Sequence, residues 1–274
     1  MAEKEPKDMS FLNHLEELRW LLVRSSLAIL GFGIFAFLFK KIIFGILLAP
    51  KNVDFWTYNF MCNLSKSFGT EGLCIDEIPF VVQSREMAGQ FSAHIWTSIY
   101  AGFIMAFPFI IWEIWKFIKP ALYIKEKKGA ASFIIISSVL FFLGILFGYF
   151  IITPLSVNFL GSYRVANEVK NNIDLASYIG LLKASVLASG MIFEMPIIIY
   201  FLSKMGLVTP NFLRKYRKYS LIIVLILAAI ITPPDIISQI IVAIPMLVLY
   251  EMSIYISGRV IKREKKKNKK AVVK

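Results

Sequence analysis

The sequence predicts an all-α membrane protein with six transmembrane helices, and two observations carry this prediction. Of the 274 residues, 57% are hydrophobic, whereas soluble domains contain about 45–50% apolar residues. The excess lies in long blocks, and one span needs roughly 20 mostly apolar residues. Within a single integral membrane domain over residues 1–274, we expect spans at 22–44, 91–111, 130–152, 178–202, 220–231 and 236–256.

The segment before the first span is expected to be helical and amphipathic. Asn13 suits an N-cap, with Glu16 three residues later in capping-box spacing, and Leu15, Leu18 and Leu22 recur at helical intervals. Residues 1–18 are mostly polar, and no small-x-small cleavage site follows a short apolar core. We therefore expect the first helix to stay as an anchor. The capping box uses one acid, Glu16, so it gives no structural reason for the second acid, Glu17.

The fifth expected span is unusually short. Residues 220–231 lie between Tyr219 and the turn Thr-Pro-Pro-Asp at 232–235. At about 1.5 Å per residue these residues cover about 18 Å, less than a hydrocarbon core of ~30 Å. We therefore expect the last two helices to be short, as a hairpin that ends within the outer leaflet or thins the bilayer.

The positive charges predict the orientation. Lys and Arg concentrate in residues 1–24, 112–130, 204–219 and 258–274, which share one side if the number of spans is even. The positive-inside rule makes that side cytoplasmic, so we expect both termini inside and a location in the cytoplasmic (inner) membrane. The basic tail at 258–274 is expected to lie against anionic lipid rather than nucleic acid.

Two sizeable loops are expected on the outer side, at residues 50–89 and 153–177, and together they suggest a cap over a concave, cupped bundle. Cys62 and Cys74 are the only cysteines in the sequence, and both lie in the first loop. In an oxidising compartment they form one disulfide, which stabilises by roughly 3 kcal/mol in the chain-entropy account. The alternative is two free thiols.

Glu194 lies near the middle of the fourth expected span, two residues before Pro196. An intramembrane carboxylate costs at least ~2.5 kcal/mol and marks a candidate functional site. It is either protonated and hydrogen-bonded inside the bundle, or it faces a hydrated concave surface or a partner helix. Pro196 favours the second arrangement because it can kink the helix. One function class that fits is an ion-coupled small-molecule transporter that works through Glu194.

The other polar residues of the spans carry weaker signals. Gln239 follows the turn before the last span and is either a partner contact or a turn cap. Glu251, near the inner end of that span, either extends to the interface or pairs with a base such as Arg259. His94, near the outer end of the second span, is expected to be hydrogen-bonded structure.

Enzyme classes find no support in the sequence. It contains no H-E-x-x-H motif, no nucleophile elbow and no Walker A motif. Two His and two Cys, with the Cys expected on the outer side, do not form a metal site. We therefore expect no catalytic residue, no metal and no cofactor.

The second cytoplasmic segment, residues 107–128, is rich in aromatic residues, which is typical of the membrane interface. Pro120 is expected to end or kink the helix before it. Glu126 then lies among lysines. From these residues alone it is either a surface acid neutralised by its neighbours or a binding residue.

Four motifs, in one order, resemble the TatC family, the core subunit of twin-arginine protein translocation. They are HLEELRWLL at His14–Leu22, WKFIKPALYIKEKK at Trp115–Lys128, FEMPIII at Phe193–Ile199, and IITPPDIISQIIVAIPMLVLYE at 230–251. The resemblance covers nearly the whole chain. The loop that carries the cysteines resembles the family least, apart from the Ala-Pro step that ends at Pro50.

The resemblance implies a receptor for signal peptides that carry two consecutive arginines. In the family the acids of the first two motifs form the pocket for the arginine pair, and here these are Glu17 and Glu126. Leu18 and Arg19 belong to the same N-terminal motif. Phe117 and Pro120 are expected to hold the second acid in place. His14 is expected to support the site without contacting the ligand.

The resemblance also implies partners and an energy source. Single-span proteins of the TatA and TatB type are expected to dock on the fifth and sixth spans, with Gln239 as a contact, and several copies are expected to associate. The proton-motive force is expected to drive passage of folded cargo, with Glu194 meeting an inserted peptide or a partner helix. Pro50 and Asp235 are expected to be structural residues of the outer side.

Overall fold

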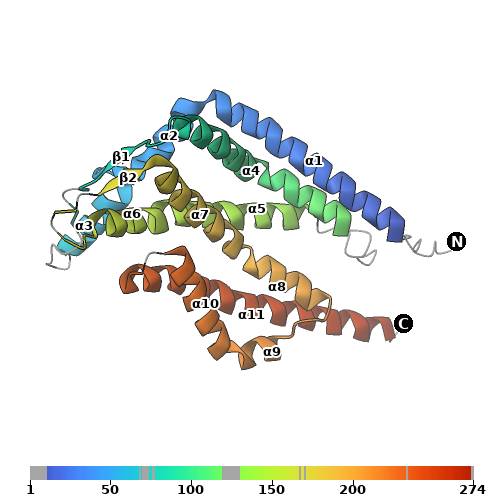
Figure 1. Ribbon diagram of the computed structural model, residues 1–274. Helices are drawn as coiled ribbons and strands as arrows, with labels where there is room; N and C mark the ends of the chain where they lie inside the picture. The colour runs from blue at the N-terminus through green and yellow to red at the C-terminus, as the bar shows by residue number, and fades with distance from the viewer. Residues whose placement is uncertain are drawn as a thin grey trace. The chain divides into compact units, whose positions relative to one another are not determined.

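The protein is described by a computed structural model in which residues 11–67, 69, 74–75, 78–118, 130–166, 168–169, 171–232 and 234–272 have a defined placement. Most of these residues are helical, and the elements are labelled in Figure 1. The chain divides into two compact units. Unit 1 comprises Met1–Ile43 and Phe91–Ser138, and unit 2 comprises Phe44–Gln90 and Val139–Lys274.

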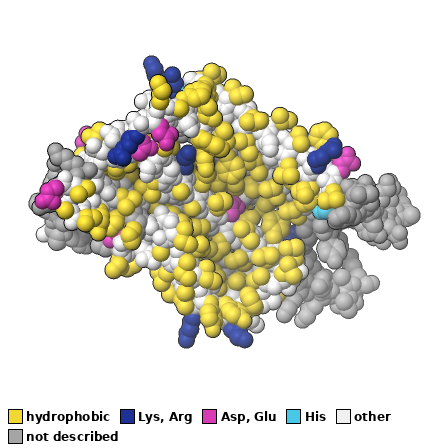
Figure 2. All heavy atoms as spheres, in the orientation of Figure 1, with side chains coloured by type: hydrophobic (Ala, Val, Ile, Leu, Met, Phe, Trp, Pro, Cys, Tyr) yellow, Lys and Arg dark blue, Asp and Glu magenta, His cyan; other side chains and the backbone are white. Residues whose placement is uncertain are grey.

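Five helical stretches in the described part of the chain are long and apolar enough to cross a membrane. They are His14–Leu38, Gly89–Ile118, Ser132–Ser162, Leu175–Lys204 and Ser238–Arg263. They overlap the first four and the last of the expected spans. Hydrophobic side chains accordingly cover much of the surface shown in Figure 2. The protein is therefore a multi-pass membrane protein, and the short fifth span at 220–231 and the single-domain organisation stay predictions.

Unit 1 is built on two long helices, α1 (Phe11–Leu38) and α4 (Gly89–Ile118), which run side by side in Figure 1. A glycine allows their close approach: a Cβ atom on Gly102 would lie 2.4 Å from the carbonyl oxygen of Ile29 and 2.6 Å from the nitrogen of Gly33. His94 stacks on Phe37 with ring centroids 3.9 Å apart. The first residues of α5 (Ala130–Phe147) belong to this unit too.

A two-stranded sheet in unit 2 joins the two loops that were expected on the outer side. Strand β1 (Val81–Gln83) pairs in parallel with β2 (Asn172–Asp174), with Val81 opposite Asn172. The helices of this region are α2, η1, α3 and α6, at Lys40–Leu48, Ala49–Lys51, Trp56–Ser67 and Thr153–Ser162. Cys62 on α3 is disulfide-bonded to Cys74, and their Cα atoms are 4.3 Å apart.

Three tyrosine hydroxyls donate hydrogen bonds to backbone carbonyls at and just after the end of α2. The hydroxyl of Tyr149 donates to the carbonyl of Ile46, and that of Tyr178 donates to the carbonyl of Leu47. The last carbonyls of a helix have no partner within it, so they need such donors when buried. The buried Tyr58 donates to the carbonyl of Pro50 at 2.9 Å, and Pro50 itself is fully buried. Burial raises the pKa of Tyr58 above its usual value, with the nearby Tyr178 adding to the effect.

The fourth candidate span is two helices rather than one. Helix α7 (Leu175–Phe193) ends and α8 (Met195–Lys204) begins at Glu194, which is in a turn. Pro196 lies near the start of α8, where a backbone N–H has no acceptor within the helix, so the N–H that proline lacks is not missed. The first expected span is also interrupted, because α1 ends at Leu38 and α2 begins at Lys40.

The C-terminal part of unit 2 packs three helices around one long helix. These are α8, α9 (Pro210–Lys215) and α10 (Arg217–Ile231), and the long helix is α11 (Ile236–Val272). The core between α10, α11 and the π-helical turn η4 (Gly148–Ile152) contains Ile152, Val224, Ala228, Val242, Ala243 and Met246. The hydroxyls of Ser203 and Ser257 link α8 to α11 at 2.7 Å.

The expectation that both of the last two helices are short was wrong for the last one. Helix α10 has 15 residues, but α11 has 37 and continues far beyond the apolar block at 236–256. Hydropathy marks where a block of apolar residues ends, not where a helix ends. The segment that follows is rich in Lys, Arg and Glu, which are good helix formers, so the helix includes most of the basic tail.

Candidate functional site

The candidate site is a cavity of about 580 Å³ in unit 1, between the N-terminal part of α1 and the C-terminal part of α4. We call it the acidic pocket. It is lined by Glu16, Glu17, Trp20, Leu21, Arg24, Glu113, Lys116 and Phe117. Residues three and four apart share one face of a helix, so the α1 residues form one wall and the α4 residues the other.

Two of the predicted binding residues line this pocket in the described structure, and His14, which was expected to support the site, lies beside one of them. Glu17 and Phe117 line it, and the ring of His14 stacks on that of Phe117 with centroids 4.3 Å apart. Leu18 and Arg19 are exposed neighbours that do not line the cavity. The guanidinium of Arg19 lies 5.6 Å from the centre of the Trp20 ring.

Two predicted residues of the site, Pro120 and Glu126, lie outside the described residues. Helix α4 ends at Ile118, two residues before Pro120. The predicted meeting of Glu126 with Glu17 therefore stays a prediction.

The pocket contains an acid that the sequence analysis missed. The side chain of Glu113 is only 3% exposed, and it pairs with two bases that are about half exposed, Arg24 at 53% and Lys116 at 43%. The Glu113 carboxylate oxygens lie 3.4 Å from Nη1 of Arg24 and 2.5 Å from Nζ of Lys116. Only the spacing from Glu113 to Lys116, one helical turn apart, was a signal in the sequence.

Aromatic rings border the charged groups of the pocket. The Arg24 guanidinium lies 5.8 Å from the centre of the Trp20 ring, and Nζ of Lys116 lies 4.1 Å from that of Trp112. Ring faces attract cations, so these rings add to the attraction of the carboxylates. A pocket with exposed carboxylates, one buried carboxylate and aromatic faces is suited to hold a planar cation such as a guanidinium.

The other predicted residues lie in unit 2. Glu194 is partly buried at the break between α7 and α8. Gln239 donates from Nε2 to the carbonyl of Leu225 at 3.0 Å and so ties α11 to α10. The carboxylate of Asp235 accepts from the backbone N–H of Ser238 at 2.8 Å and from its hydroxyl, which caps the start of α11. Glu251, which was expected either to extend to the interface or to pair with a base such as Arg259, pairs with Arg217 on α10 at 2.6 Å.

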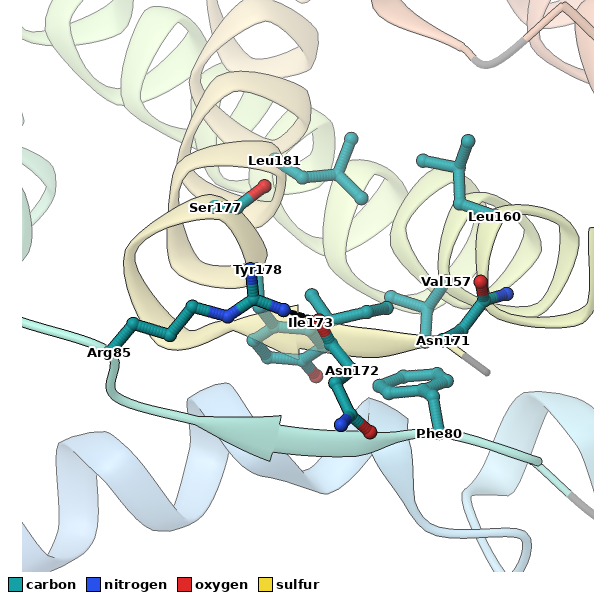
Figure 3. Close-up of a pocket in the computed structure, with 10 residues that line it drawn as sticks. All are labelled: Phe80, Arg85, Val157, Leu160, Asn171, Asn172, Ile173, Ser177, Tyr178 and Leu181. Carbon is teal, nitrogen blue, oxygen red and sulfur yellow. Dashed lines mark hydrogen bonds between the residues drawn. The ribbon is translucent and has the colours of Figure 1, made fainter. Parts of the chain in front are cut away.

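A second cavity, of about 560 Å³, lies beside the sheet of unit 2 (Figure 3). Arg85 holds this region together: its Nη2 donates to the carbonyl of Asn172, and its backbone N–H donates to the carboxylate of Asp174. Hydrogen bonds from the backbone N–H groups of Arg85 and of the first turn of α7 lower the pKa of Asp174. These contacts link the segment that follows β1 to β2 and to the start of α7.

Comparison with known proteins identifies the family. The model of the family described as Sec-independent protein translocase protein (TatC) matches residues 13–245. The chain is 42% identical to the TatC protein of Blattabacterium sp. subsp. Periplaneta americana (strain BPLAN), over 96% of this chain and 100% of the relative. It is 38% identical to the TatC protein of Aquifex aeolicus (strain VF5), over 96% and 100% of the two chains.

A solved structure agrees with these relatives. The crystal structure described as the twin arginine translocase receptor TatC superimposes with a TM-score of 0.68 at 35% identity, covering 90% of this chain and 99% of the other. The relatives cover 96% of the chain, and the family match at residues 13–245 includes both walls of the acidic pocket. The chain belongs to the TatC family and is a multi-pass membrane component of Sec-independent, twin-arginine protein translocation.

Proposed function

We propose that the protein is a receptor for signal peptides that carry two consecutive arginines, and that the acidic pocket receives them. The observation that supports this most is the position of Glu17 in a cavity of about 580 Å³ that aromatic side chains border. Glu126, which belongs to the second motif, supplies the other acid in this proposal. The resemblance of both motifs to those of the family connects the pocket to the arginine pair.

The chemistry of the pocket favours arginine over lysine. A guanidinium is planar and always charged, and it forms two parallel hydrogen bonds to one carboxylate. A lysine ammonium offers the same charge without this geometry. The proposed site therefore discriminates between Arg-Arg and Lys-Lys peptides, even though both carry two positive charges.

The transport cycle is part of the same proposal. Both termini lie in the cytoplasm, the membrane is the cytoplasmic (inner) membrane, and α10 is the fifth of six spans. The bound peptide inserts along a concave face of the bundle. Single-span partners of the TatA and TatB type dock on α10 and α11, copies of the complex associate, and the proton-motive force drives export of the folded cargo.

A second candidate function, ion-coupled transport of a small molecule through Glu194, has one observation in its favour. The span that contains Glu194 is broken at that residue, and broken helices bind ions and substrates in many transporters. The two functions place their working acids in different elements. The receptor works through Glu17 and Glu126, and the transporter works through Glu194 alone.

Binding of a twin-arginine peptide to the purified protein tests the receptor. We expect Glu17→Gln and Glu126→Gln each to weaken binding by about ten-fold or more, because each removes one charge-assisted contact worth ~1.5–3 kcal/mol. The measurement is titration of a fluorescent peptide, with Lys40→Gln as a control for altered charge at an exposed position on α2. Unchanged affinity in both glutamate variants would contradict the proposed pocket.

A further inference from the structure

Glu113 is the most buried charged group of the acidic pocket, and its two oxygens are held in different ways. One oxygen pairs with Lys116 on the same helix at 2.5 Å. The other faces Arg24 on α1 at 3.4 Å. Charge-assisted N–H···O hydrogen bonds are commonly about 2.7–2.9 Å long, so the contact with Arg24 is loose. One oxygen of the buried Glu113 carboxylate is therefore paired only loosely, with the guanidinium of Arg24.

The guanidinium of Arg24 has two partners other than Glu113, namely water and the ring of Trp20. Its side chain is 53% exposed, so water already solvates part of the guanidinium. The face of Trp20 lies within cation–π distance, at 5.8 Å from the guanidinium carbon to the ring centre. Arg24 can thus leave Glu113 and keep both hydration and an aromatic contact.

Glu113, in contrast, cannot be left without a cation at low cost. At 3% exposure it has almost no contact with solvent, and although Lys116 stays on one oxygen, the departure of Arg24 leaves the other oxygen without its cation, which is destabilising for a buried carboxylate. A ligand that brings its own guanidinium satisfies this requirement. Exchange of one guanidinium for another keeps the carboxylate paired throughout, and the incoming group gains if it reaches normal hydrogen-bond distance.

We propose that Glu113 is a further specificity-determining residue of the site, and that Arg24 occupies it until an arginine of the signal peptide takes its place. The inference rests on the proposed receptor function and names a residue of the same pocket. Arg24 then competes with the ligand. Glu113 lines the same cavity as Glu16 and Glu17, so the arginine that Glu17 receives also reaches Glu113, and Glu126 receives the other arginine.

This exchange predicts effects of opposite sign for the two members of one ion pair. Glu113→Gln removes the acceptor, so binding of an Arg-Arg peptide should weaken by about ten-fold or more. Arg24→Gln removes the competitor, so the fraction of the protein in which Glu113 is open to the peptide rises. The affinity for the Arg-Arg peptide should therefore increase by roughly three-fold or more. If the pair were only a link between α1 and α4, both substitutions would weaken binding.

The experiment titrates full-length protein in detergent with two fluorescent peptides, one with Arg-Arg and one with Lys-Lys. Wild type, Glu113→Gln, Arg24→Gln and the charge control Lys40→Gln are compared, and thermal unfolding of each variant checks that it is folded. The loss in Glu113→Gln should be large for the Arg-Arg peptide and less than about two-fold for the Lys-Lys peptide, because only a guanidinium makes the bidentate contact.

Each outcome decides the inference. Weaker Arg-Arg binding in Glu113→Gln together with tighter binding in Arg24→Gln supports it. Unchanged binding in Glu113→Gln, or weaker binding in Arg24→Gln, overturns it while the receptor function stands, provided that wild type still prefers the Arg-Arg peptide. Absence of that preference in wild type would overturn the receptor function and, with it, this inference. A Glu113→Gln protein that does not fold leaves Arg24→Gln to decide through the sign of its effect.

Discussion

Replacement of Gly102 by alanine is expected to separate α1 from α4 and to abolish binding at the acidic pocket. The added Cβ would lie 2.4 Å from the carbonyl oxygen of Ile29 and 2.6 Å from the nitrogen of Gly33. Both atoms belong to the backbone of a helix, so neither can turn aside as a flexible side chain does. Overpacked cores lose about 1–3 kcal/mol or more, and we expect the upper end of this range here.

Gly31 offers a matched control for that substitution. It lies on α1 in the same unit, and a Cβ atom there would meet nothing within 4 Å. Gly31→Ala should therefore be neutral or stabilise by about 0.5–1 kcal/mol, because alanine favours the helix. Thermal unfolding in detergent and peptide titration measure both variants. Equal stability of Gly102→Ala and wild type would show that the two helices do not depend on this close contact.

Replacement of Glu194 by leucine is expected to leave signal-peptide binding intact and to impair a later step of export. Glu194 lies in unit 2 and contributes nothing to the acidic pocket. Its backbone forms the junction of α7 and α8, where its carbonyl accepts from the N–H groups of Ile197 and Ile198 at 3.0 and 3.1 Å. The backbone break should survive the substitution, so the change removes mainly the polar side chain from the membrane.

We expect Glu194→Leu to reduce the export rate by roughly ten-fold, since a polar contact between helices in a membrane is worth ~1–2 kcal/mol. Glu194→Gln keeps hydrogen-bonding capacity and should retain more export than the leucine variant. Peptide affinity, measured on the same preparations, should change by less than about two-fold. Loss of signal-peptide binding in Glu194→Leu would show that Glu194 also takes part in recognition, which the account assigns to the acidic pocket alone.

The spans were the part of the fold that the sequence predicted best. Five of the six expected spans overlap helices long and apolar enough to cross a membrane, because a bilayer imposes a minimum length of apolar sequence. The ends of the helices were predicted less well. The break at Glu194 and the continuation of α11 to Val272 depend on backbone geometry and helix propensity, to which hydropathy is insensitive.

The candidate site was predicted only in part. Glu17 and Phe117 were found through motifs that lie within short stretches of sequence. Glu113 was missed because its significance depends on a partner 89 residues away in the chain, Arg24 on another helix. The pairing of β1 with β2 and the hydrogen bonds of Tyr149 and Tyr178 were missed for the same reason, since each joins segments that are distant in the sequence.

Export of a folded reporter with a twin-arginine signal, in cells whose own TatC is replaced by this chain and its partners, tests the central claim most directly. We predict that the wild-type chain exports the Arg-Arg reporter and retains the Lys-Lys reporter, and that the Glu17→Gln, Glu126→Gln double variant exports neither. A correctly inserted wild-type chain that fails to export the Arg-Arg reporter, or a double variant that exports it normally, would contradict the account.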